Sequence, residues 1–328
     1  MNLDNKTILI TGGTGSFGKA LITHLLEEHE PRTIRVYSRD ELKQSELDRL
    51  HADEDRLRFM IGDVRDLPRL TRATRGVDVI LHAAAMKQVP ACEYNPFEAV
   101  QTNLMGAENV VSAAIENEVP LTMALSTDKA VNPVNLYGAT KLAAEKVFAQ
   151  GNAYAADSAA RFASARYGNV VGSRGSVIPL FLAQAQTGVI TITDERMTRF
   201  WITLDQAVEF VLDCLGRMGG GETFVPRIPS MRVTDIAEAL APDCERRIIG
   251  IRPGEKLHEV LVTEDEARHT IDADFGYVIA PEYASWGLRD HGPRGALPDG
   301  FRYASDTNDQ WLTVDELREM AAGVTAVA

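Results

Sequence analysis

The chain has 328 residues, of which 45% are hydrophobic and 25% charged, as in an ordinary soluble globular protein that can bury a sizeable core. Its formal net charge of −13 argues against a nucleic-acid groove, which usually presents a basic patch. The three cysteines, Cys92, Cys214 and Cys244, are too widely spaced to indicate a disulfide framework or a zinc knuckle. We find no signal-peptide pattern and no apolar run of membrane length, so we expect a cytoplasmic protein without nucleic-acid or membrane partners.

The first predicted unit is a strand, a glycine-rich turn and an amphipathic helix. Residues 7–11 form the apolar strand. Gly12, Gly15 and Gly18 follow in a G-x-x-G-x-x-G pattern, which lets the backbone approach a pyrophosphate at the N-terminus of the helix. The alternative is a glycine-rich turn that binds no ligand. The flanking strand and helix favour dinucleotide binding.

The second predicted strand, residues 33–37, ends beside charged side chains. A site that prefers NAD usually has an acidic residue here, which binds the ribose 2′-hydroxyl. The first charge after this strand is instead Arg39, and Lys43 follows one helical turn later. Two cations suit a 2′-phosphate, so the sequence favours NADP, with Asp40 as the N-cap of the next helix. The alternative for Arg39 is a solvated surface charge.

Further strands are predicted at 57–61, 77–81, 121–125 and 161–167, and they alternate with helices, one of them long at about 96–117. This alternation predicts an α/β fold with a doubly wound parallel sheet of the Rossmann type. Asp63 follows the third strand, where a carboxylate could meet the adenine amino group. Small residues follow the fourth strand, where they would let the backbone pass close to a cofactor.

The rhythm of strands and helices changes after residue 171, where irregular segments rich in glycine and proline begin. We therefore predict an NADP-binding domain at 1–171, to which 200–225 returns. The segments 172–199 and 226–328 would form a smaller α/β substrate-binding lobe. Residues 283–306 are expected to be a loop, and 311–320 a closing helix.

The stretch 126–141 carries the residues with the clearest chemical potential. Tyr137 and Lys141 are four positions apart at the start of a predicted helix, so both side chains would share one face. The ammonium would then lower the pKa of the phenol and let it act as a base. Asp128 and Lys129 pair an acid with a potential base at the carboxyl end of a strand. If that strand continued through them, their side chains would point to opposite faces and only one would reach a substrate.

The glycine pattern, Asp63, Ser126, Tyr137 and Lys141 together resemble the extended short-chain dehydrogenase/reductase superfamily. The match is narrower for the soluble, inverting UDP-N-acetylglucosamine 4,6-dehydratases, which open pseudaminic acid biosynthesis. Its motifs lie at 126–129, 135–141, 167–176, 197–203 and 251–259, and the resemblance runs from about 3 to 268 and again near Trp311. The stretch 272–306 does not obviously follow the family.

The resemblance implies a reaction for these residues. Tyr137, assisted by Lys141, would take the proton of the hydroxyl on sugar carbon 4 while a hydride passes to NADP⁺. Lys129 would remove the hydrogen on carbon 5, which requires a depressed pKa. Asp128, beside Thr127, would protonate the hydroxyl that leaves carbon 6. The hydride would return to carbon 6, giving a UDP-2-acetamido-2,6-dideoxy-4-hexulose with carbon 5 inverted.

The same resemblance implies two sets of binding residues and no metal ligands. For the cofactor they are Gly12, Thr14, Gly15, Ser16, Phe17, Gly18, Ser38, Arg39, Asp40, Lys43, Asp63, Val64, Ala83, Ala84, Lys87, Asn103, Ser126, Tyr137, Lys141, Tyr167, Asn169 and Val170. For the substrate they are Lys87, Asn169, Ser176, Val177, Pro179, Thr191, Met197, Thr198, Arg199, Arg252 and Glu255. Arg199 and Arg252 are expected to clamp the diphosphate, although each could instead be an internal salt-bridge partner.

Three alternatives stay open. The first is a UDP-sugar 4-epimerase or ketoreductase, because simple 4-epimerases share the fold but lack the acid–base pair. The second is a retaining 4,6-dehydratase; the dTDP-glucose enzymes carry a glutamate in place of Lys129. The third is a nucleotide-sensing scaffold without turnover, against which the intact Tyr137 and Lys141 weigh. The family also implies a homo-oligomer, a dimer or a hexamer, with the helices at 96–117 and 137–150 as a plausible interface.

Overall fold

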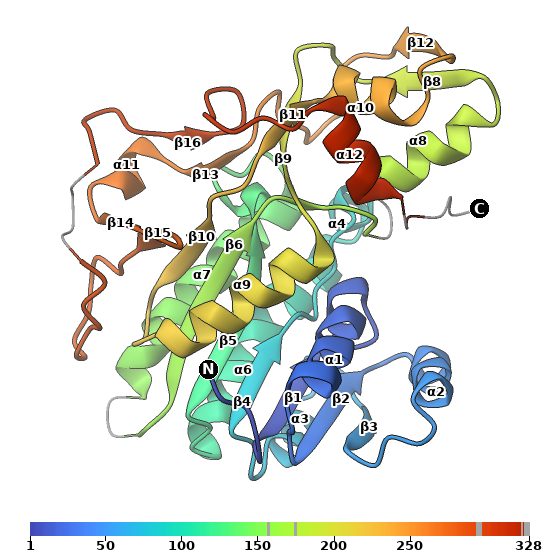
Figure 1. Ribbon diagram of the computed structural model, residues 1–328. Helices are drawn as coiled ribbons and strands as arrows, with labels where there is room; N and C mark the ends of the chain where they lie inside the picture. Colours follow the sequence, from blue (N-terminus) through green and yellow to red (C-terminus); the bar gives the residue numbers. More distant parts are fainter. Residues whose placement is uncertain (156–157, 174–175, 293–296, 323, 325–328) are drawn as a thin grey trace.

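The computed structural model describes residues 1–155, 158–173, 176–292, 297–322 and 324 (Figure 1). Arg174 and Gly175 of the motif at 167–176 therefore lie outside the described residues, as do 293–296 of the predicted loop. No helix in the described part of the chain is both long and apolar enough to cross a bilayer.

A nine-stranded sheet forms the centre of the molecule. Its strands are β1 (Thr7–Thr11), β2 (Thr33–Ser38), β3 (Leu57–Ile61), β4 (Val79–His82), β5 (Leu121–Thr127), β6 (Arg161–Tyr167), β10 (Thr223–Pro226), β14 (Thr270–Ala273) and β15 (Gly276–Ile279). Their spatial order is β3-β2-β1-β4-β5-β6-β10-β15-β14, parallel from β3 to β10 and antiparallel at β15 and β14. The predicted doubly wound α/β fold is confirmed.

Helices cover both faces of this sheet, which is why a strand such as β1 is buried along its whole length and has an apolar centre. Successive residues of a strand point to opposite faces. Ile8 and Ile10 accordingly join the core under α1 (Ser16–Glu28) and α9 (Leu204–Arg217), whereas Leu9 joins the core under α3 (Leu67–Ala73), α6 (Gly106–Glu116) and α7 (Leu136–Tyr154). The shorter α2 (Glu41–Leu50) connects β2 to β3.

The long helix predicted at 96–117 is three consecutive helical segments. After α4 (Val89–Tyr94), these are α5 (Pro96–Ala99), a π-helical segment (Val100–Met105) and α6. Asn103 lies in the π-helical segment, where its side chain accepts a hydrogen bond from Met86 N at 2.8 Å and donates to Thr140 Oγ1 at 3.0 Å. It therefore ties the loop after β4 to α7. Such π segments occur frequently at functional sites.

The remaining elements form a smaller region above the carboxyl ends of the parallel strands (Figure 1). They are β7 (Asn169–Val170), α8 (Val177–Ala185), β8 (Val189–Ile192), β9 (Thr198–Ile202), β11 (Ser230–Arg232), α10 (Val233–Leu240), β12 (Glu245–Ile248), β13 (Val260–Val262), α11 (Glu264–Ala267), β16 (Tyr303–Ala304) and α12 (Val314–Ala321). Three small sheets occur here: β11-β9-β7, β12-β8 and β13-β16. Phe181, Trp201 and Ile236 belong to a separate core under α8, α10 and α12.

One part of the predicted domain division needs correction. Residues 226–328 were assigned to the smaller lobe, but β14 and β15 within that range extend the large sheet. The physical reason is that β15 pairs antiparallel with β10 and so covers an otherwise open sheet edge. The range 200–225, expected to return to the first domain, holds α9 and β10, while the other boundaries stay predictions.

Candidate active site

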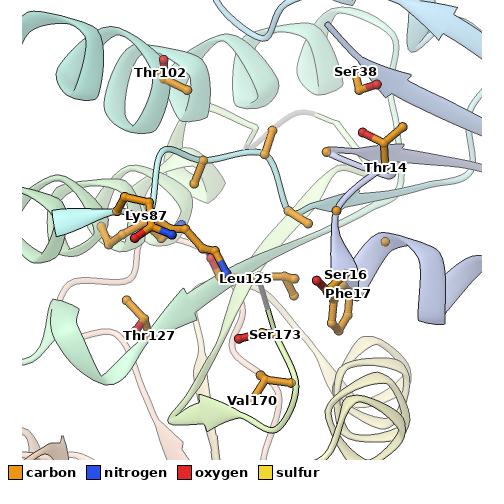
Figure 2. Close-up of a pocket in the computed structure, with 18 of the residues that line it drawn as sticks. Thr14, Ser16, Phe17, Ser38, Lys87, Thr102, Leu125, Thr127, Val170 and Ser173 are labelled. Atoms are coloured by element: carbon orange, nitrogen blue, oxygen red, sulfur yellow. The ribbon is translucent and has the colours of Figure 1, made fainter. Parts of the chain in front are cut away.

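A cavity of about 590 Å³ opens at the carboxyl ends of the parallel strands, where open α/β sheets bind their ligands. The turn between β1 and α1 forms one side of it, and the ends of β2 to β6 form the rest. Figure 2 shows Thr14, Ser16 and Phe17 on one side of the cavity and Lys87 and Thr127 across from them. Val170 and Ser173 line it from the segment after β6.

The glycine-rich turn leaves its backbone open to a ligand. Gly12 has φ +69°, and a Cβ atom there would lie 2.8 Å from the backbone of Ala84, so only glycine fits between the two strand ends. Helix α1 begins with Gly15 as its N-cap, and no side chain caps it. Its first N–H groups are therefore suited to bind a pyrophosphate.

The end of β2 holds the residues predicted to read the ribose. Asp40 caps α2, since its side chain accepts a hydrogen bond from Lys43 N at 3.0 Å, which confirms the predicted N-cap. Lys43 Nζ lies 2.6 Å from Asp40 Oδ2, and Arg39 Nη1 lies 3.5 Å from Asp63 Oδ2. Both cations line the cavity, each beside a carboxylate.

The predicted acid and base lie together because strand β5 ends before it reaches them. Strand β5 ends at Thr127, and a 3₁₀ turn follows at Asp128–Ala130, here called the acid–base turn. Lys129 Nζ donates a hydrogen bond to Asp128 Oδ1 at 2.8 Å, and Thr127 Oγ1 donates to the same oxygen at 2.8 Å. Asp128 Oδ2 is buried and has no hydrogen-bond partner among the described residues. The turn thus removes the strand alternation that would have separated the two side chains.

Helix α7 places Tyr137 and Lys141 beside this turn. A Cβ atom at Gly138 would lie 2.0 Å from the carbonyl oxygen of Lys129, so glycine is needed for α7 to pack this closely against the acid–base turn. Lys141 Nζ donates to the carbonyl oxygen of Leu125 at 2.7 Å. Burial lowers the pKa of Lys141 to about 8, against the opposing charge of Glu145.

Two electrostatic expectations are wrong in this structure. Burial raises the pKa of Tyr137 to about 12, although the charge of Lys129 and a hydrogen bond with Thr127 act to lower it. Burial also acts to lower the pKa of Lys129, but the nearby carboxylates of Asp128 and Glu259 outweigh burial and raise it. The expected depression at both groups does not occur, because a phenolate is poorly solvated here and the amine lies between two anions.

The cavity gathers most residues of the predicted site but not all of them. Every predicted cofactor residue except Asn103 lines it, as do Thr127, Lys129, Lys87, Asn169 and Ser176. Asp128 is fully buried behind the cavity wall. The predicted substrate residues that do not line this cavity are Val177, Pro179, Thr191, Met197, Thr198, Arg199, Arg252 and Glu255.

The two predicted diphosphate clamps already have protein partners. Arg199 donates to the backbone carbonyl oxygens of Thr198, Lys256 and Leu257 at 2.7–3.1 Å. Arg252 lies 2.6 Å from Glu255, and its side chain is 59% exposed. Both arginines therefore have partners within the protein, as the alternative interpretation expected. Their role in binding a diphosphate stays a prediction.

Sequence reasoning missed a second set of contacts with the acid–base turn. Lys256 Nζ donates to the carbonyl oxygens of Asp128 at 3.1 Å and Val131 at 2.6 Å, from 128 and 125 positions away in the sequence. Asn135, the N-cap of α7, donates its side-chain amide to Gly254 O at 2.7 Å. The segment 251–259 stood out only through its family resemblance. No local pattern connects it to the acid–base turn. In the described part of the chain no group of side chains is arranged to hold a metal ion.

Comparison with known proteins narrows the family. The family described as "Polysaccharide biosynthesis protein" matches residues 8–281. A Campylobacter jejuni protein named UDP-N-acetylglucosamine 4,6-dehydratase (inverting) is 50% identical over 326 residues, 97% of each chain. A Rickettsia conorii protein named UDP-glucose 4-epimerase is 40% identical over 96% of this chain and 95% of its own.

A solved structure, described as Pen from Bacillus thuringiensis, superposes with a TM-score of 0.89 at 36% identity and covers 98% of both chains. The resemblance to inverting UDP-N-acetylglucosamine 4,6-dehydratases seen in the sequence is confirmed by the Campylobacter match. The chain therefore belongs to the polysaccharide biosynthesis protein family.

Proposed function

We propose that this protein removes water from UDP-N-acetylglucosamine across carbons 4 to 6 and inverts carbon 5, with tightly bound NADP. The observation that carries the proposal is the hydrogen bond between Lys129 and Asp128 at the edge of the cavity that Tyr137 and Lys141 also line. An acid–base pair is what water elimination needs beyond simple oxidation of carbon 4. Identity of 50% to a named inverting dehydratase supports the same reaction.

The cavity suits a dinucleotide. The Gly12 turn and the uncapped start of α1 offer N–H groups to a pyrophosphate, and Arg39 and Lys43 offer cations to a 2′-phosphate. When bound, the cofactor accepts a hydride from carbon 4 and later returns it to carbon 6. Tyr137 then serves as the base for the hydroxyl on carbon 4, and Lys141 supplies positive charge beside it below a pH of about 8.

The Lys129–Asp128 ion pair holds the right number of protons for the elimination. Moving one proton from Lys129 Nζ to Asp128 Oδ1, along their 2.8 Å hydrogen bond, gives a neutral amine and a carboxylic acid. The amine takes the proton from carbon 5, and the acid gives its proton to the hydroxyl that leaves carbon 6. The pair returns to the ion-paired form. When carbon 6 receives the hydride, carbon 5 takes a proton from solvent and Tyr137 releases the proton of the carbon-4 hydroxyl, so no net proton is gained or lost.

The test is to incubate the purified protein with UDP-N-acetylglucosamine in deuterated water. We expect the product to lose one water by mass spectrometry and to carry deuterium on an inverted carbon 5 by NMR. An unlabelled product would contradict the role of Lys129, and retained configuration would contradict inversion.

A UDP-sugar 4-epimerase is the second candidate. It is favoured by the 40% identity to a named UDP-glucose 4-epimerase over most of both chains. This activity would leave the substrate mass unchanged and give an epimer at carbon 4. The same mass spectrum therefore separates the two candidates.

We also propose a cytoplasmic homo-oligomer whose product enters pseudaminic acid synthesis. Large apolar side chains are exposed on the helices predicted to form the interface: Phe97 is 83% exposed at α5, and Tyr154 is 84% exposed at the end of α7. Light scattering on the purified protein tests the assembly, with a monomer as the contradicting result.

A further inference from the structure

Glu259 is a buried carboxylate, directly before β13, that the reaction described above does not use. It is 3% exposed. Its N–H donates to Ser305 Oγ at 2.9 Å, and its carbonyl oxygen accepts from Ser305 N at 2.8 Å. These two hydrogen bonds hold the backbone of Glu259 against the segment that follows β16.

The side chain of Glu259 lies among three cations. Its Oε1 is 3.5 Å from Lys129 Nζ and 3.9 Å from Arg199 Nε, and its Oε2 is 3.3 Å from Lys256 Nζ. Burial acts to raise the pKa of Glu259, but these cations outweigh burial and lower it, so the group is a carboxylate. A buried charge of this kind is costly unless it is paired.

We propose that Glu259 is a positioning residue for the elimination: it holds the Lys129 amine at the cavity and stabilises the positive charge that Lys129 gains when it takes a proton. This inference rests on the proposed dehydratase function. Asp128 is the acid of the pair, so this second carboxylate comes from outside the local sequence, from the segment before β13.

The packing around Glu259 makes the contact specific. Val131, directly after the acid–base turn, shares a small apolar cluster with Val260 and Ala304 of the β13–β16 sheet. Lys256 adds hydrogen bonds to the carbonyl oxygens of Asp128 in the turn and of Val131 directly after it. The β13–β16 sheet therefore fixes the distance between Glu259 and Lys129.

The chemistry explains why a carboxylate is useful there. When the C5–H bond breaks, its proton moves to Lys129 Nζ and its electron pair stays with the sugar as the hydroxyl leaves with the proton of Asp128. A positive charge then forms 3.5 Å from Glu259 Oε1. A carboxylate behind a general base stabilises such a charge, as the aspartate does behind the histidine of a serine protease.

All charged groups that face Lys129 enter the expected pH dependence. They are Asp128 in the same turn, Tyr137 from α7, Arg199 from β9, and Glu259, with Lys256 behind Glu259. Lys129 Nζ and Asp128 Oδ1 share a hydrogen bond, and this pair must hold one proton to act as base and acid. Removing the negative charge of Glu259 disfavours the protonated forms of the pair. Both limbs of its pH profile should then move to lower pH.

The experiment compares Glu259→Gln with the wild type on UDP-N-acetylglucosamine in deuterated water. We expect deuterium uptake at carbon 5 to slow about tenfold or more, and both limbs of its pH profile to shift down by about one unit. The first-turnover absorbance of reduced nicotinamide should be unchanged, since the oxidation uses Tyr137. A merely structural role would slow both steps together.

Two variants control for folding and charge. Glu259→Asp keeps the charge and should recover most of the wild-type pH profile. Glu266→Gln removes a partly buried carboxylate that pairs with Arg166 rather than with Lys129, and should leave the limbs in place. An unshifted profile in a folded Glu259→Gln protein overturns the inference. A wild type that releases no water overturns the proposed function instead.

Discussion

Two lysines reach the same cavity from different parts of the molecule, and their pKa values are shifted in opposite directions. Lys141 lies on α7 against the large sheet, 6% exposed, with its ammonium on the Leu125 carbonyl oxygen. Lys129 lies on the acid–base turn between Asp128 and Glu259. Burial lowers the pKa of Lys141 to about 8, whereas the two carboxylates raise that of Lys129.

The difference shows that burial alone does not decide the charge of a lysine. Lys141 has its nearest carboxylate, Glu145, one turn along its own helix, and that carboxylate is paired with Arg166 at 2.7 Å. Lys129 faces a carboxylate, Glu259, that another part of the chain holds within 3.5 Å. The pKa of Lys141 depends on burial and a neighbour on its own helix, whereas that of Lys129 depends on the adjacent Asp128 and on Glu259 from the C-terminal part of the chain.

The largest expected effect comes from removing the amine of Lys129. In Lys129→Met, deuterium uptake at carbon 5 should fall by about 10²- to 10⁴-fold, the usual contribution of a general base. Formation of reduced nicotinamide in the first turnover should persist, because Tyr137 and Lys141 are intact. Lys141→Met should instead slow both steps. Equal losses of both steps in Lys129→Met would remove the distinction between the two lysines.

The next effect concerns the buried arginine that pairs with Glu145, the carboxylate next to Lys141 on α7. Arg166 is 2% exposed and pairs with both Glu145 and Glu266. Arg166→Leu leaves the buried Glu145 and the partly buried Glu266 without their cation, so the free energy of unfolding should fall by about 3–5 kcal/mol. Urea denaturation measures this.

The matched control for that variant is Arg217→Leu on the surface. Arg217 pairs with Asp213 at 2.7 Å, and both side chains are 44% exposed. Its loss should cost less than about 1 kcal/mol. A similar decrease in the free energy of unfolding for both variants would contradict the expected cost of leaving the buried carboxylate unpaired.

A smaller effect is expected on the pKa of Lys141. The charge of Glu145 acts to raise the pKa of Lys141, so Glu145→Gln should lower it from about 8. Lys141 is charged below its pKa, so the oxidation step should lose this charge at a lower pH than in the wild type. The pH dependence of first-turnover absorbance measures the shift. Glu209→Gln, an exposed change on α9, should give the wild-type curve.

The smallest effect concerns the cofactor end of the cavity. Arg39 is 57% exposed, so Arg39→Ala should weaken NADP binding by only about fivefold, the effect of one partly screened ion pair. Binding of NAD should not change. Fluorescence titration with each cofactor measures both affinities, and Arg49→Ala, an exposed change on α2, is the control. Equal weakening of NAD and NADP would contradict the assignment of Arg39 to the 2′-phosphate.

The sequence alone determined the features that depend on neighbours along the chain. Alternating apolar strands and helices gave the doubly wound sheet, the glycine spacing gave the turn before α1, and four-residue spacing placed Tyr137 and Lys141 on one helical face. Asp40 was identified as an N-cap from its position alone. These are short-range effects, so a single sequence contains them.

Only the tertiary structure decided which charges surround the reacting groups. Glu259 and Lys256 meet the acid–base turn across more than a hundred residues of chain, and the pairing of β15 with β10 drew part of the presumed lobe into the large sheet. The pKa of Lys129 is raised by the adjacent Asp128 and, across the fold, by Glu259. Coulomb interactions depend on distances in space and on burial, and neither can be read from the spacing of residues along the chain.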